Sequence, residues 1–216
     1  MMLGQTAGQS FYNLSRFVFQ KTDAVTGKGY VSLLGDQEQL AANLKNYVAG
    51  FSANAREIFL DKFKFGEQID RLDDANLLYL VVGKFTEIDL HPDVVDNIEM
   101  GYIFEELIRR FSEASNETAG EHFTPREVIR LMVNLLFNED GEALTKKGVI
   151  RTLYDPACGT GGMLSVAENY LRELNEKATL KVFGQELNPE SYAICKSDML
   201  IKGEDATHVK FGNSFT

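Results

Sequence analysis

A glycine-rich turn between an apolar strand and a helix is the feature that most constrains this chain. The run Val149–Tyr154 is apolar enough for a buried strand, and the segment that follows is Asp155-Pro-Ala-Cys-Gly-Thr-Gly-Gly162. Residues Met163–Glu176 then have helical character. Glycines at such a turn let the backbone bend tightly and approach a ligand closely. The pattern predicts a strand, a turn and a helix, with a binding site at the turn.

The chain beyond this turn continues to alternate between strands and helices. Leu180–Gly184 predicts a second strand and His208–Phe211 a third. Between them, Asn188 can cap a helix that opens with Pro189 and closes at Gly203. This alternation predicts a parallel sheet with crossover helices. An open sheet of this kind normally has more strands, so we expect a truncated domain.

The first part of the chain is predicted to be helical, because apolar residues recur there at helical spacing. Packing between helices explains these rows of apolar residues. The four candidate helices are Gln37–Val48, Ala53–Phe65, Asp73–Lys84 and Met100–Phe111. We therefore expect a helical N-terminal domain over residues 1–115 and a sheet domain over residues 116–216.

A strong helix start follows the polar residues 112–122. Thr124 is expected as the N-cap, Pro125 as the first helical residue and Glu127 as the third, which is the pattern of a capping box. Phe123 before the cap could pack against an apolar residue in the first turns. We expect this helix to end near Phe137.

Composition and charge exclude several classes of protein. Hydrophobic residues make up 44% and charged residues 25%, as in ordinary globular proteins. No apolar run can span a bilayer and no signal peptide is found, so we expect no membrane partner and a cytoplasmic protein. Cys158 and Cys195 form no metal-binding pattern with the histidines, so no metal site is predicted. The net charge of −10 is spread evenly, so most phosphate contacts of any bound DNA must come from elsewhere.

The residues around the glycine turn discriminate between ligand classes. A phosphate-binding loop requires a lysine after Gly162, and none is present. The dinucleotide fingerprint requires its third glycine at position 164, which is leucine. Asp155 at the strand end would repel a pyrophosphate but suits a cationic amine, and Glu186 after the second strand can accept hydrogen bonds from two ribose hydroxyls. S-adenosylmethionine combines an amino acid, a ribose and a base.

Simpler interpretations of the same residues stay open at this point. The glycines could form a turn that binds no ligand, and Glu186 could lie on a solvated loop. Thr124, Pro125 and Glu127 could be a helix cap and nothing more. Asn213, after the third strand, could be an ordinary turn residue.

Four segments resemble the modification (M) subunit of type I restriction–modification systems, an N6-adenine DNA methyltransferase family. They occur in the order and spacing of that family, and the resemblance covers roughly residues 35–216. The segments are Met100–Phe111, Asn116–Arg126, Asp155–Gly162 and Gly184–Asn188. The resemblance implies an α/β fold: a Rossmann-like, S-adenosylmethionine-dependent methyltransferase sheet, here truncated, preceded by a helical N-terminal domain.

The resemblance also implies an activity and partners. The activity is methyl transfer from S-adenosyl-L-methionine to N6 of adenine in double-stranded DNA. A separate specificity (S) subunit would choose the DNA sequence, a restriction (R) subunit would complete the system, and DNA would be contacted mainly through these partners.

The resemblance further implies a set of cofactor-binding residues. Asp155 would bind the amino group of the cofactor, Glu186 the ribose, and Leu187 would pack on the adenine, with Asn213 near the ring. The segment Glu121–Arg126 would contact the methionine end. The full set is Glu121, His122, Phe123, Thr124, Pro125, Arg126, Asp155, Ala157, Gly159, Thr160, Gly161, Gly162, Glu186, Leu187 and Asn213.

One motif of the family is missing. Its catalytic tetrapeptide, Asn/Asp-Pro-Pro-Phe/Tyr, requires adjacent prolines, and the four prolines of this chain stand apart. We therefore expect the catalytic residues beyond Thr216 and no activity from this chain alone. The alternatives are a methyltransferase acting on RNA or protein, a non-catalytic interaction module with a methyltransferase-like fold, and a nicotinamide oxidoreductase, which the glycine spacing disfavours.

Overall fold

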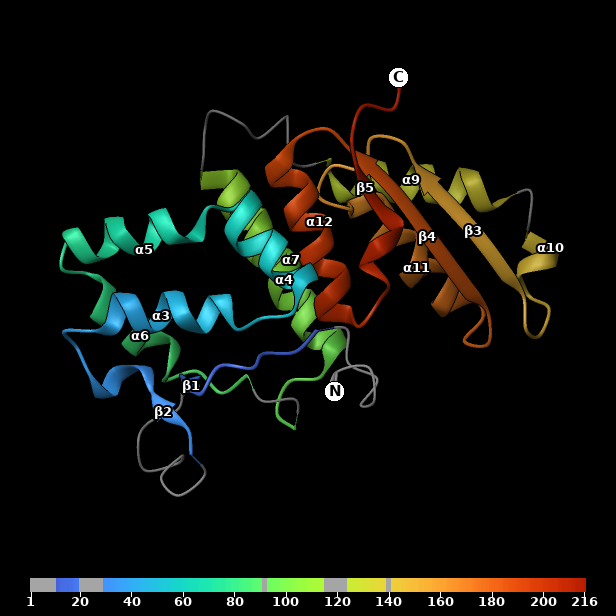
Figure 1. The fold of residues 1–216 in the computed structure, drawn as a ribbon. Coiled ribbons are helices and arrows are strands. Elements are labelled where there is room, and N and C mark those ends of the chain that lie inside the picture. Colours follow the sequence, from blue (N-terminus) through green and yellow to red (C-terminus); the bar gives the residue numbers. More distant parts are fainter. Residues whose placement is uncertain (1–10, 20–28, 91–92, 115–123, 139–140) are drawn as a thin grey trace. The chain divides into compact units, whose positions relative to one another are not determined.

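The computed structural model describes residues 11–19, 29–90, 93–114, 124–138 and 141–216, and Figure 1 labels their helices and strands. The segment Glu121–Phe123, expected to contact a cofactor, lies outside the described residues. Contacts divide the chain into two compact units, Met1–Met100 and Gly101–Thr216. No described helix has both the length and the apolarity needed to cross a membrane.

The first unit consists mainly of short helices, with one small pair of strands. Strands β1 and β2 are parallel, and a helical segment of the wider π type directly follows α4. The elements are β1 (Phe17–Val18), β2 (Val31–Ser32), η1 (Leu33–Gly35), α3 (Leu40–Ala49), α4 (Ala53–Arg56), η2 (Glu57–Lys62), α5 (Phe65–Asp74) and α6 (Leu78–Phe85). Helix α7 (Asn97–Ala114) follows, includes the predicted helix Met100–Phe111 and belongs mostly to the second unit.

The predicted helix Asp73–Lys84 is wrong at its start. Asp73 and Asp74 end α5, and Asn76 then adopts a φ of 57°. That left-handed conformation does not continue a right-handed helix, although asparagine tolerates it better than most residues. A new helix, α6, therefore begins at Leu78.

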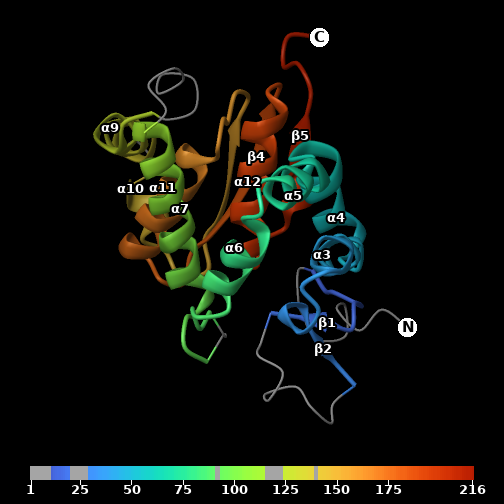
Figure 2. The ribbon, with the colours of Figure 1, turned by 90° about the vertical axis from the view of Figure 1, so that its left-hand side faces the viewer.

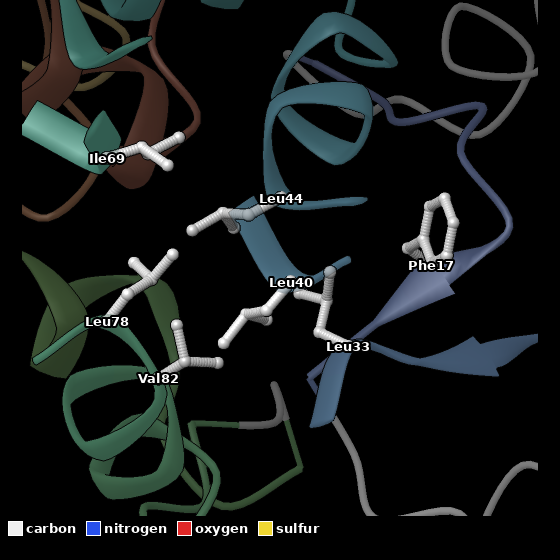
Figure 3. Packing of buried hydrophobic residues seen from close by; sticks show 7 residues of the cluster. All are labelled: Phe17, Leu33, Leu40, Leu44, Ile69, Leu78 and Val82. Carbon is white, nitrogen blue, oxygen red and sulfur yellow. The ribbon is translucent and has the colours of Figure 1, made fainter. Parts of the chain in front are cut away.

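The core of the first unit lies between α3, α5, α6 and the residues around β1 and β2. Leu40 and Leu44 are four residues apart on α3, as are Leu78 and Val82 on α6, so each pair shares one helix face. Figure 3 shows these side chains directed toward one another. The buried cluster consists of Phe17, Leu33, Leu40, Leu44, Ile69, Leu78 and Val82.

The second unit contains a three-stranded parallel sheet. The strands lie in the order β3-β4-β5, so each crossover connects neighbouring strands. Because such crossovers are right-handed, α11 and α12 cover the same face of the sheet. The elements are α9 (Arg126–Asn138), α10 (Gly141–Leu144), β3 (Ile150–Asp155), α11 (Gly162–Leu174), β4 (Thr179–Glu186), α12 (Pro189–Lys202), η3 (Ala206–His208) and β5 (Val209–Phe211).

Helix ends in this unit show how local sequence determines the elements. The Asn188 side chain accepts hydrogen bonds from the backbone N–H groups of Glu190 and Ser191, and Gly203 closes α12 with a φ of 77°, both as predicted. Helix α9 begins one residue later than the capping box predicts. The Pro125 carbonyl accepts from the N–H of Ile129 at 3.1 Å, so Pro125 takes the capping place expected for Thr124.

The two faces of the sheet differ in burial. Leu180 and Val182 of β4 are buried, and α9 packs against α11 on the helix side (Figure 2). On the other face, Ile150 and Tyr154 of β3 are 60% and 56% exposed. Parallel sheets are normally covered on both faces. The described residues cover only one.

Candidate functional site

The loop between β3 and α11 is a tight turn formed by glycines. Gly159 and Gly161 have φ angles of +54° and +88°, which lie in a region of backbone conformation that residues other than glycine rarely adopt. The Gly161 N–H donates to the Cys158 carbonyl at 2.8 Å. The predicted turn is therefore present, and its glycines are required by backbone conformation.

The glycines of this loop differ in what surrounds them. A Cβ at Gly161 would lie 2.8 Å from the buried Cys195 Sγ, and a Cβ at Gly162 would lie 3.1 Å from Ile129 Cδ1. At Gly159 a Cβ would meet no atom within 4 Å. Gly161 and Gly162 thus allow close packing inside the protein, whereas Gly159 borders open space where a ligand could lie.

The contact between Gly162 and Ile129 has a further consequence. Ile129 stands in the first turn of α9, one turn after Pro125, and Gly162 is the first residue of α11. The start of the Thr124–Arg126 segment is thereby brought to the same side of the unit as the glycine loop. Thr124 and Pro125 are exposed there.

The two predicted acidic residues lie at the ends of neighbouring strands. Asp155 pairs in register with Gly184, two residues before Glu186. Glu186 Oε2 accepts the Gly159 N–H at 2.8 Å, and its Oε1 accepts the Asn188 N–H at 2.7 Å. Asp155 Oδ1 accepts the Ala157 N–H at 3.0 Å. The Glu186 carboxylate therefore joins the glycine loop to the end of β4.

The charges of the two carboxylates interact. Partial burial raises the pKa of Asp155, the N–H of Ala157 opposes this effect, and the negative charge of Glu186 adds to the increase. A cation placed beside Asp155 would relieve both the burial penalty and the repulsion. The site thus favours a ligand that carries a positive group at the Asp155 side.

The end of β5 completes this edge of the sheet. The Gly212 N–H donates to the Glu186 carbonyl at 3.0 Å, and the exposed Asn213 uses its side-chain oxygen to accept the Phe215 N–H at 3.0 Å. Ser214 donates a hydrogen bond from its hydroxyl to the Pro156 carbonyl in the glycine loop. Sequence reasoning missed Ser214, because no local pattern relates it to a residue so distant in the chain.

The structure brings together the predicted residues that follow the three strands. Asp155, Gly159, Glu186 and Asn213 all lie at the carboxyl edge of the sheet, which is where α/β proteins bind ligands. Ala157 is exposed, Thr160 is half-buried, and Leu187 is 60% exposed beside Glu186.

A cavity elsewhere in the second unit does not belong to this edge. It measures 360 Å³ and is lined by residues of α9 and α11 and by Tyr102. None of the predicted site residues lines it. In the described parts of the chain, no cluster of three or more His, Cys, Asp or Glu side chains could hold a metal ion.

Comparisons with known proteins give a consistent result. The family model described as N-6 DNA Methylase matches residues 96–216. The type I restriction enzyme EcoEI methylase subunit of Escherichia coli is 31% identical over 189 residues, which are 84% of this chain and 36% of that protein. The MjaVII methylase subunit of Methanocaldococcus jannaschii is 26% identical over 94% of this chain and 34% of its own length. The chain thus spans about a third of the length of these relatives.

A solved structure supports the fold. The type I restriction–modification methyltransferase subunit from Streptococcus thermophilus has a TM-score of 0.58 and 24% identity, covering 88% of this chain and 38% of that chain. This likeness confirms the predicted fold class, a methyltransferase sheet of the Rossmann-like type with helices before it. Because the family model covers more than half of the chain, the chain belongs to the N-6 DNA methylase family, and its resemblance to type I modification subunits is confirmed.

Proposed function

We propose that this chain is part of the modification subunit of a type I restriction–modification system. The whole protein would transfer a methyl group from S-adenosyl-L-methionine to N6 of adenine in double-stranded DNA. In this proposal residues 1–115 form the helical N-terminal domain and residues 116–216 the first part of the methyltransferase domain. A specificity subunit and a restriction subunit are its proposed partners, and they supply most DNA contacts, in keeping with the net charge of −10.

The observation that carries this proposal is the pair of carboxylates joined through the glycine loop. Asp155 and Glu186 stand at adjacent strand ends, and the Gly159 N–H binds Glu186. A carboxylate has about four lone-pair positions. Glu186 uses two for backbone N–H groups and keeps others for the hydroxyls of a ribose.

The chemistry of S-adenosylmethionine matches these groups one by one. Its ammonium group suits Asp155, whose carboxylate gains from a neighbouring cation. Its carboxylate suits the partial positive charge at the start of α11. Gly159 leaves room for the ligand to lie against the backbone. Bound there, the cofactor supplies a methyl group activated by the sulfonium.

The remaining residues have supporting roles in the proposal. Ala157, Thr160, Gly161 and Gly162 shape the loop, and Leu187 and Asn213 border the adenine. The segment Glu121–Arg126 contacts the methionine end. This chain holds and orients the cofactor, which accounts for much of the catalysis when two reactants must be aligned. The target adenine must be flipped out of the duplex to reach it. No residue of this chain is proposed to hold the target amino group, because its four prolines are not adjacent.

The test is isothermal titration of the chain with S-adenosylmethionine. Binding is expected, and Asp155→Ala and Glu186→Ala should each lose about 1–3 kcal/mol of binding free energy through a lost charged hydrogen bond. Glu176→Ala, an exposed carboxylate in the loop before β4, is the matched control and should bind normally. NAD is titrated in parallel and should not bind.

Two results would contradict the proposal. Unchanged affinity in both acidic-site variants would remove the assignment of the site, and tight binding of NAD would favour an oxidoreductase. Methyl transfer to adenine-containing DNA is measured separately, and turnover by this chain alone would contradict the expectation that its catalytic residues lie elsewhere.

A further inference from the structure

The loop that follows β5 reaches the loop that follows β3 across the end of the middle strand. Strand β4 lies between β3 and β5 in the sheet. The Ser214 hydroxyl donates a hydrogen bond to the carbonyl of Pro156, 58 residues earlier. Pro156 directly follows Asp155. The contact therefore joins the two outer loops of the sheet next to the first acidic residue of the site.

Backbone hydrogen bonds determine where Ser214 lies. The Gly212 N–H donates to the Glu186 carbonyl at 3.0 Å, which continues the pairing of β4 and β5 beyond the strand. Asn213 then closes a turn by accepting the Phe215 N–H at 3.0 Å. Ser214 stands within this turn, so its position is set by the strand end and the asparagine.

The other polar groups of the glycine loop are held by β3 and β4. The Ala157 N–H binds Asp155, the Cys158 N–H binds the Gln185 carbonyl at 3.1 Å, and the Gly159 N–H binds Glu186. Pro156 has no N–H to donate. Within the described part of the chain, its carbonyl is bound by Ser214. Ser214 thus adds a second contact to the peptide group between Pro156 and Ala157, whose N–H already binds Asp155.

We propose that Ser214 is a positioning residue for cofactor binding. It keeps the loop from Asp155 to Gly162 in its binding conformation without touching the ligand. This inference rests on the proposed function, because it takes S-adenosylmethionine as the ligand. A loop that is already ordered loses less conformational entropy when the ligand binds. Ser214 and Pro156 are both exposed, so loss of the hydroxyl leaves no buried group without a partner, and we expect folding to be unaffected.

The experiment compares two variants of nearly the same shape. Ser214→Thr keeps the hydroxyl, whereas Ser214→Val replaces it with a methyl group. In the free chain, hydrogen–deuterium exchange of the amides of Ala157 to Gly159 should be faster in S214V and unchanged in S214T. In titration with S-adenosylmethionine, S214V should bind about five-fold more weakly, the equivalent of one hydrogen bond, and S214T should bind normally.

The control is Thr216→Val, which removes a neighbouring hydroxyl that binds the Asn213 carbonyl and not the glycine loop. It should leave both exchange and affinity unchanged. Normal exchange and normal affinity in S214V would overturn the inference, and so would a fall in its unfolding midpoint that T216V lacks. If the wild-type chain fails to bind S-adenosylmethionine, the proposed function fails, while the exchange data still decide whether Ser214 orders the loop.

Discussion

The two units of this protein use polar residues in different ways. In the first unit most buried positions are apolar side chains, such as Leu40 and Leu44, and the ion pair Lys45–Asp70 lies at the surface. This unit has long-range hydrogen bonds as well, but those of its partly buried residues join uncharged groups, such as the Asn13 amide and the Tyr47 carbonyl. In the second unit, carboxylates take part in the hydrogen bonds that connect residues far apart in the chain. Gly159 binds Glu186, and Ser165 of α11 binds Asp198 of α12 at 2.9 Å.

This difference shows which changes each unit should tolerate. Helices packed by apolar stripes lose stability when a buried side chain is shortened, and polar exchanges at their surface matter little. The sheet edge of the second unit should instead respond to small changes in shape and charge, because its loops are held by specific backbone and carboxylate contacts.

The largest expected effect is the loss of a buried leucine from the first unit. Leu44→Ala removes a side chain that is 5% exposed, and it should lower the free energy of unfolding by about 2–5 kcal/mol. Leu80→Ala is the matched control, because that side chain is 64% exposed, and it should change stability by less than about 0.5 kcal/mol. Urea denaturation followed by circular dichroism measures both. Equal losses in the two variants would mean that the cluster is not the core.

Substitutions of two glycines test the second unit through the same quantity, the free energy of unfolding. Gly161→Ala combines a left-handed φ of +88° with a Cβ 2.8 Å from Cys195 Sγ, so we expect the free energy of unfolding to fall by about 2–4 kcal/mol. Gly159→Ala meets only the φ penalty of about 1–2 kcal/mol. Adding the substitution Cys195→Ala to Gly161→Ala should recover part of the lost free energy of unfolding, because the two residues are in contact. Additive effects in the double variant would contradict the packing account.

These two units also differ in how much could be predicted from the sequence. The strand, turn and helix around Asp155 follow local rules, and the carboxyl ends of parallel strands meet at one edge, so the approach of Asp155 to Glu186 could be foreseen. In the first unit the sequence prediction missed α5, although Phe65, Ile69 and Leu72 stand at helical spacing and pack into the core. Lys64 before it adopts a left-handed φ of 47°, which separates α5 from the preceding helix and is not expected of a lysine.

Long-range contacts account for most of what the sequence did not predict. Nothing near Gly161 indicates that Cys195 lies against it, and nothing near Ser214 indicates Pro156. Both contacts arise because the order of strands brings distant loops to one edge. Helix α9 begins at Arg126, one residue later than predicted, because the Pro125 carbonyl begins its hydrogen-bond series. The roles of Thr124, Arg126 and Leu187 toward a cofactor stay predictions.

The affinity of the sheet edge for S-adenosylmethionine should depend on pH through Asp155. Burial and the charge of Glu186 raise the pKa of Asp155, so this carboxyl gains its proton at a higher pH than an ordinary aspartate. A protonated Asp155 attracts an ammonium group less strongly, so affinity for S-adenosylmethionine should fall as pH is lowered through that pKa. Titration calorimetry at a series of pH values, starting near the pKa of an ordinary aspartate at about 4 and going upward, measures this. An affinity independent of pH in this range would remove Asp155 from the site.

Stability of the second unit should depend on pH through another carboxyl. Burial, with the neighbouring Glu168 carboxyl, raises the pKa of Glu204 from 4.5 to about 9. Between these values the folded chain holds a proton that the unfolded chain has released, so the free energy of unfolding should fall as pH rises from about 4.5 to about 9. Glu204→Gln cannot lose a proton and should flatten this slope. Denaturation at several pH values tests it, and an unchanged slope in E204Q would show that Glu204 titrates normally.

The smallest expected effect lies on the surface of the first unit. Lys45 on α3 and Asp70 on α5 form an ion pair at 2.5 Å, but their side chains are 43% and 56% exposed. Water and salt screen such a pair, so Lys45→Met should cost less than about 1 kcal/mol of unfolding free energy. The difference from wild type should vanish in about 1 M salt, where the screening length is about 3 Å. A larger loss that persists in salt would show that the first unit, like the second, depends on specific contacts of charged groups, and it would remove the contrast between them.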